Sequence, residues 1–182
     1  MQQKSITPTS SNLPPKIQVI LDTNIIKKII DRYSVEEFAK YLSDLVKRNG
    51  TFVISDFTCF ELVRGANLST ENEVFPILNL VTRLLITTQV LFASARLETL
   101  YKLEDIQPST IEIGDKIIAA TAILNSSFIL TANGRDFPWP YFIEVERRII
   151  EYKDKNKRTK CIPVSLLIPD FNTVSKRFNE RS

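Results

Sequence analysis

Apolar and polar positions along the chain follow two periodicities. Short runs that are almost wholly apolar occur at residues 17–21, 51–54 and 128–130, and a further run at 86–92 is rich in β-branched and aromatic residues. Such runs are typical of buried strands in a parallel sheet. Elsewhere, apolar residues recur every three or four positions, which predicts helices over 24–32, 34–49, 56–65, 71–84, 94–104 and 115–124. Strands alternating with helices predict an α/β fold with a central parallel sheet.

Capping residues agree with several of these helix boundaries. Ser34 and Glu37 form a capping box, in which each residue satisfies a backbone donor of the other. Gly50 suits the end of that helix, and Ser55 is expected to cap the next one. Pro76 lies inside another helical pattern and predicts a kink or a later start.

The two ends of the chain differ from its middle. Residues 1–15 are rich in Gln, Ser, Thr and Pro and are expected to be a disordered leader before a domain at 16–143. The segment 144–182 is a basic C-terminal extension with two possible structures. It could be a hairpin of 148–152 and 161–167 around a basic turn. It could equally be helical, with an apolar face formed by Phe142, Val145, Ile149 and Tyr152.

Composition excludes several kinds of chemistry. Histidine is absent from the 182 residues, so a Ser-His-Asp triad, a histidine zinc site and a histidine general base are impossible. The four glycines form no phosphate-binding fingerprint. Cys59 and Cys161 fit no metal-binding pattern and are expected to be reduced thiols. No apolar run reaches the length of a membrane span, so we expect a cytoplasmic protein that contacts no membrane.

The net charge of +3 is concentrated in the C-terminal part. Residues 141–182 carry ten basic and six acidic side chains, whereas residues 1–140 have a net charge of −1. The densest part is a run at 153–160, which could neutralise nucleic-acid phosphates or could be a solvated surface turn. If the run binds RNA, the candidate contacts are Lys155, Lys157, Arg158 and Lys160.

Four carboxylates stand where a parallel sheet would bring them together. Asp22 ends the first strand and Asp136 follows the last one, while Asp115 opens a helix and Glu61 lies in another. The ends of parallel strands and the starts of the following helices share one edge. Each acid also has a simple structural explanation, such as helix capping by Asp22 or exposure of Glu61. Together they predict a metal site, because converging carboxylates repel one another unless a cation lies between them.

Oxygen ligands without histidine indicate Mg²⁺ or Mn²⁺ as the cation. A divalent cation of this kind lowers the pKa of water and stabilises charge on phosphate oxygens. The chemistry that the four acids predict is therefore metal-dependent phosphodiester hydrolysis, with no nucleophile from the protein.

The four acids lie in four ordered motifs, Val19–Asn24, Phe60–Ala66, Gly114–Ala122 and Ile129–Phe137. In these motifs the chain resembles the PIN-domain ribonucleases, and among them most closely the VapC-type toxins of type II toxin–antitoxin systems. The resemblance implies a three-layer α/β/α sandwich and an Mg²⁺- or Mn²⁺-dependent endoribonuclease acting on single-stranded or looped RNA. It also implies a homodimer and an antitoxin protein as partner.

The resemblance further implies roles for individual residues. Asp22, Glu61 and Asp115 would be the principal metal-binding acids. The more variable fourth part of the site would be formed by Thr131 with either Asn133 or Asp136. The supporting residues would be Thr23 and Asn24, and Arg135 is a further candidate RNA contact.

Two other interpretations remain open. The leader and the basic extension make this chain longer than a minimal toxin, and a stand-alone RNA-processing nuclease would have a similar sequence. A PIN module that binds RNA or protein without cleaving it is the other alternative, although all the acidic positions are filled.

Overall fold

The computed structural model describes residues 16–30, 35–66, 71–106, 110–153 and 158–180. The expected leader and Ser34 of the expected capping box lie outside these residues. The strands are β1 (Ile17–Leu21), β2 (Gly50–Ser55), β3 (Thr82–Leu84), β4 (Phe128–Thr131), β5 (Phe142–Lys153) and β6 (Thr159–Pro169). The α-helices are α1 (Thr23–Ile30), α2 (Val35–Lys47), α3 (Asp56–Gly65), α4 (Glu71–Leu80), α5 (Thr88–Leu103), α6 (Ile113–Leu124) and α7 (Phe171–Asn179). A 3₁₀ turn, η2 (Gly134–Asp136), follows β4.

The sheet contains the expected parallel part, formed by β1 to β4, and is mixed as a whole because the β5–β6 hairpin adds antiparallel strands. Its strand order is β3-β2-β1-β4-β6-β5. The first four strands are parallel neighbours, whereas β6 runs antiparallel to β4 and β5 runs antiparallel to β6. Strands β5 and β6 are antiparallel to each other because their connection is short, and a short connection joins only antiparallel strands.

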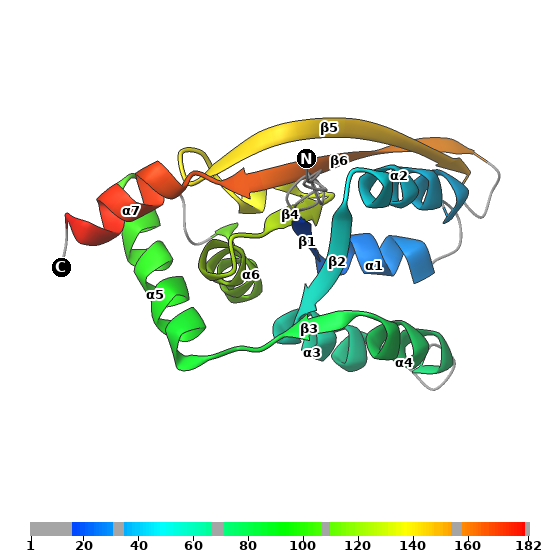
Figure 1. Ribbon diagram of the computed structural model, residues 1–182, viewed down its shortest axis with the longest axis horizontal. Coiled ribbons are helices and arrows are strands. Elements are labelled where there is room, and N and C mark those ends of the chain that lie inside the picture. Colours follow the sequence, from blue (N-terminus) through cyan, green and yellow to red (C-terminus); the bar gives the residue numbers. More distant parts are fainter. Residues whose placement is uncertain (1–15, 31–34, 67–70, 107–109, 154–157, 181–182) are drawn as a thin grey trace, which may run out of the picture.

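Helices cover both faces of the sheet, as the three-layer expectation requires. Side chains of β1 alternate between two apolar cores: Ile20 packs with α5, α6 and α7, whereas Val19 and Leu21 pack with α1, α2, α3 and α4. Figure 1 shows α5, α6 and α7 on one side of the sheet and α1 to α4 on the other. Because successive side chains of a strand point to opposite faces, a strand in such a central position needs apolar residues on both faces, as Val19, Ile20 and Leu21 provide.

The expected strand at 86–92 is wrong. The strand in this region is β3 at Thr82–Leu84, which pairs with β2 in parallel, and the expected helix at 71–84 ends at Leu80. Helix α5 begins at Thr88 because the Thr87 hydroxyl caps it, accepting the Val90 N–H at 3.3 Å. Capping therefore outweighs the strand propensity of the β-branched run.

The C-terminal extension forms a hairpin, so the helical alternative for its first part is wrong. Strands β5 and β6 pair over their whole length, with a bulge between Glu144 and Glu146. Ion pairs connect β5 to α2 and to the residue that follows this helix: Arg148 pairs with Asp44 at 3.2 Å, and Glu146 pairs with Arg48 at 2.8 Å. The hairpin ends in α7, whose start is capped by Asp170. None of the described helices is long and apolar enough to cross a bilayer.

Candidate active site

Asp22 lies at the carboxyl end of β1, where its side chain is only 3% exposed. Its Oδ2 accepts two hydrogen bonds of 2.6 Å, one from the Thr131 hydroxyl at the end of β4 and one from the Asn24 amide. Its backbone N–H donates to the Leu130 carbonyl at 3.0 Å. Two neighbouring parallel strands and the start of α1 therefore fix the position of this carboxylate.

Asn24 and Thr131 have additional contacts that hold them in place. The Asn24 Oδ1 accepts the Ala132 N–H at 2.9 Å, which ties α1 to the loop after β4. The Thr131 hydroxyl accepts the Asn133 N–H at 2.9 Å while it donates to Asp22. A hydroxyl that both donates and accepts has a fixed orientation, so these residues act as the support of Asp22.

Glu61 and Asp115 approach Asp22 from two helices. The Thr23 hydroxyl at the start of α1 donates a short hydrogen bond to Glu61 Oε2 on α3. Asp115 lies in the first turn of α6, next to Gly114. A Cβ atom at Gly114 would lie only 2.2 Å from the Phe57 ring, so glycine allows α6 to pack closely against α3.

The charges of the candidate acids influence one another's pKa values. Burial raises the pKa of Asp22 to about 6, although the hydrogen bond from Thr131 lowers it. The charges of Glu61 and Asp136 add to the rise. Burial also raises the pKa of Asp115 to about 7, and the charges of Asp136, Asp22, Glu112 and Glu61 add to it. Burial and the charge of Glu112 raise the pKa of Asp136, whereas the hydrogen bond from Asn133 lowers it.

The carboxylate oxygens of the four candidate acids are ligands that suit a cation. Among the described residues, no lysine or arginine forms an ion pair with Asp22, Glu61, Asp115 or Asp136. A buried carboxylate without a cationic partner is unfavourable, and a hard divalent cation with oxygen ligands would relieve it. The carboxylates are not preassembled, because no three acidic or cysteine side chains in the described part lie close enough to hold a metal.

The remaining predicted residues lie in two places. The Asn133 amide donates to Asp136 Oδ2 at 2.6 Å, so both candidates for the fourth position occur in one small unit, with the exposed Arg135 between them. Arg158 and Lys160 are exposed next to the hairpin turn. Lys155 and Lys157 lie outside the described residues.

Glu112 is an acidic residue that the sequence analysis missed. It precedes α6 directly and gives that helix no side-chain cap, and its charge raises the pKa of both Asp115 and Asp136. The signal in the sequence was a second acid three residues before Asp115, next to the predicted start of the helix.

Comparison with known proteins agrees with this architecture. A model of the PIN domain matches residues 19–142, more than half of the chain. The crystal structure of VapBC2 from Rickettsia felis bound to a DNA fragment from their promoter is similar, with a TM-score of 0.55 and 21% identity over 66% of this chain and 91% of that chain. The structure of VapBC-1 from nontypeable Haemophilus influenzae has a TM-score of 0.56 and 23% identity over 66% and 90% of the two chains. At such identities the likeness shows the fold. No curated protein matches the sequence.

Proposed function

The chain belongs to the PIN-domain family, and from this premise we propose that it is a metal-dependent endoribonuclease that hydrolyses phosphodiester bonds in single-stranded or looped RNA. The observation that carries the proposal is the buried carboxylate of Asp22, which interacts with three other acids and, among the described residues, pairs with no basic side chain. An arrangement of this kind disfavours a purely structural role, because it destabilises the fold when the acids are charged.

In this proposal Asp22, Glu61 and Asp115 hold Mg²⁺ or Mn²⁺, and Asp136 completes the set. The cation would activate water and stabilise charge on the phosphate that is cleaved. Thr131 and Asn24 keep the Asp22 carboxylate in one orientation, and Thr23 does the same for Glu61. Asn133 positions Asp136 through their shared hydrogen bond.

We further propose that the protein acts as a toxin with an antitoxin protein as partner and that it forms a homodimer. Support comes from the two similar structures, both of which are VapBC proteins by their descriptions. A stand-alone RNA-processing nuclease is the alternative, and in that case neutralisation by a neighbouring gene product would be absent. Growth of cells that express the protein, with and without the product of an adjacent small reading frame, distinguishes these two roles.

Cleavage of a labelled RNA with single-stranded loops tests the enzymatic proposal. We expect cutting in the loops with Mn²⁺ or Mg²⁺, no cutting with EDTA, and loss of cutting in Asp22→Asn and Asp115→Asn proteins that remain folded. Lys40→Gln is a matched surface control, because Lys40 lies on α2 and its ion-pair partners among the described residues are the exposed Glu36 and Glu37. Full activity in either aspartate variant would contradict the proposed site. RNA binding without cutting would instead favour a non-cleaving module.

A further inference from the structure

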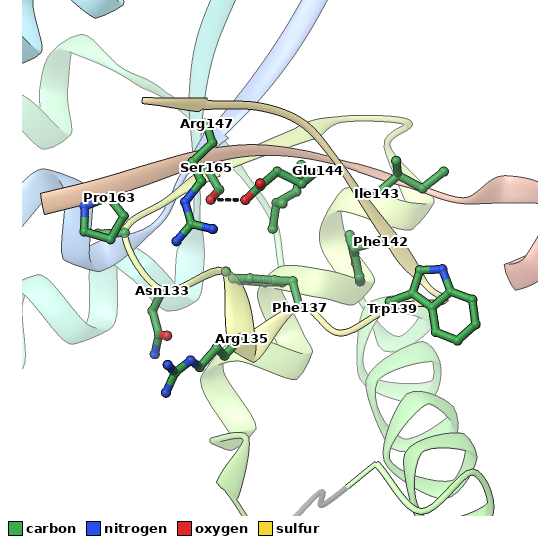
Figure 2. Close-up of a pocket in the computed structure, with 13 residues that line it drawn as sticks. Asn133, Arg135, Phe137, Trp139, Phe142, Ile143, Glu144, Arg147, Pro163 and Ser165 are labelled. Carbon is green, nitrogen blue, oxygen red and sulfur yellow. Dashed lines mark hydrogen bonds between the residues drawn. The ribbon is translucent and has the colours of Figure 1, made fainter. Parts of the chain in front are cut away.

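A cavity of about 690 Å³ lies between the loop that follows β4 and the β5–β6 hairpin. The loop contributes Asn133, Arg135 and Trp139, and the hairpin contributes Glu144, Arg147 and Ser165. Figure 2 shows Arg147, Ser165 and Glu144 on one side, Asn133 and Arg135 on the opposite side, and Trp139 at the end. Its volume falls within the range of about 300–1,000 Å³ that is typical of ligand sites.

The charged side chains of this cavity leave a positive excess. Among the described residues, Arg135 and Arg147 form no ion pair, and both are exposed. The one carboxylate in the lining, Glu144, accepts a hydrogen bond from Ser165 at 2.5 Å. Arginine is suited to phosphate because its planar guanidinium group can donate two parallel hydrogen bonds.

Trp139 supplies a different kind of contact at the same cavity. Its side chain is 80% exposed, and it is the only tryptophan in the chain. Pro138 and Pro140 flank it, and their rings restrict the backbone that presents the indole. A large exposed aromatic ring beside unpaired arginines is typical of surfaces that bind single-stranded nucleic acid, where bases stack on the ring and cations contact the backbone.

Hydrogen bonds connect this cavity to the acidic site. Asn133 lines the cavity, and its side-chain amide donates to Asp136. Its backbone N–H donates to the hydroxyl of Thr131, which in turn donates to Asp22. A nucleotide in the cavity would therefore lie beside the residues proposed to cleave the chain.

We propose that this cavity is an RNA subsite that takes one unstacked nucleotide next to the cleaved bond, with its base on Trp139 and its phosphates on Arg135 and Arg147. The inference rests on the proposed function and deepens it, because it gives a reason for single-stranded substrates. Bases in a duplex are stacked on their neighbours and cannot reach the indole. The β5–β6 hairpin supplies Arg147, so the C-terminal extension contributes to RNA binding through the body of its first strand.

Tryptophan fluorescence tests the subsite directly, because all of the tryptophan emission comes from Trp139. The probes are a single-stranded RNA of twelve nucleotides and a fully paired duplex of the same sequence, added to the Asp115→Asn protein with Mg²⁺. Wild-type protein in EDTA is the second form in which cutting is blocked. We expect the single strand to quench the emission in a saturable way and the duplex to leave it unchanged.

Variants separate the stacking contact from the phosphate contacts. Trp139→Ala should weaken binding of the single strand, measured by anisotropy of a labelled RNA, by about 10- to 100-fold, while Trp139→Phe should restore most of it. Arg135→Gln and Arg147→Gln should each reduce the slope of log affinity against log salt by about 0.7. Lys40→Gln, which removes one charge outside the cavity, should leave the affinity for RNA unchanged, and melting curves verify that each variant is folded.

The outcomes distinguish failure of the subsite from failure of the proposed function. Unchanged emission with saturating RNA, equal quenching by the duplex, or wild-type affinity of Trp139→Ala would overturn the subsite even if the protein cleaves RNA. Quenching by a peptide partner but not by RNA would overturn it as well and would assign the cavity to protein binding. Strand-selective quenching without any metal-dependent cutting would support the subsite and refute the nuclease.

Discussion

Raising the pH from 5 to 8 should destabilise the metal-free protein, because the fold buries carboxyl groups that become charged in this range. The pKa of Asp22 is raised from 3.8 to about 6, and that of Asp115 from 3.8 to about 7. The folded state therefore holds these protons more tightly than the unfolded state does. The stabilisation is present while the acids are protonated and is lost as the pH rises through their folded pKa values.

The magnitude follows from the better-buried group. A pKa that rises from 3.8 to about 6 disfavours the charged form of Asp22 by about 3 kcal/mol, of which about half is lost between pH 5 and pH 8. For a chain of this size, such a loss lowers the melting temperature by about 3–6 °C. Asp115 acts in the same direction, but it is more exposed than Asp22 and solvent screens it.

Urea unfolding in EDTA, followed by circular dichroism at several pH values, measures this effect. Because the chain has no histidine, few other side chains titrate in the same range. Asp22→Asn is the matched variant and should show a flatter pH dependence than wild type. Mn²⁺ added at pH 8 should restore stability in wild type and much less in Asp22→Asn. Stability that stays level or rises from pH 5 to 8 in wild type would refute the reasoning.

Three further predictions concern the support of the site, the core and the basic turn. Thr131→Val removes the hydroxyl that orients Asp22 and should lower metal affinity and cleavage by about 10- to 100-fold. Titration calorimetry measures the metal affinity, and initial rates measure cleavage. Thr99→Val, on the exposed face of α5, is the control, and equal activity of the two variants would contradict this role of Thr131. Leu97→Ala removes a fully buried side chain from the core around α5 and should cost about 2–5 kcal/mol in urea unfolding; a cost below 1 kcal/mol would disprove close packing there. Replacing Lys155, Lys157, Arg158 and Lys160 with Gln should weaken RNA binding and flatten its salt dependence; an unchanged slope would make the turn a solvated surface.

The sequence predicts the central part of this fold because its strands are buried on both faces. The almost wholly apolar run of β1 is the direct result of two cores, with Val19 and Leu21 in one and Ile20 in the other. The prediction of a strand at 86–92 was wrong because these residues do not lie in the sheet. The β-branched residues there belong to a loop and a helix start, and one hydroxyl, that of Thr87, decides the outcome.

The C-terminal extension could not be assigned because its pattern fits two periods. Phe142, Val145, Ile149 and Tyr152 match helical spacing, yet they lie on a strand. The bulge between Glu144 and Glu146 interrupts the alternation that would have marked the strand. The pairing of β6 with β4 and the ion pair between β5 and α2 are tertiary contacts, so the local sequence pattern does not predict them.

Three of the candidate acids could be proposed from their places, because Asp22 and Asp136 follow strands and Asp115 stands near a helix start, whereas Glu61 lies in the middle of α3. Their supporting contacts could not, since the hydrogen bond from Thr23 to Glu61 joins residues on different helices. The contact between Asn24 and Ala132 likewise spans most of the chain. Glu112 was missed because a single acid before a helix has many ordinary explanations.

The central claim is that carboxylates from separate elements hold one divalent cation. Anomalous diffraction from crystals of the wild-type protein soaked in Mn²⁺ above pH 7 tests it most directly. We predict a manganese peak in contact with the carboxylates of Asp22 and Asp115, near Glu61 and Asp136, and no such peak in Asp115→Asn crystals. A wild-type peak elsewhere, or none at these acids, would contradict the account.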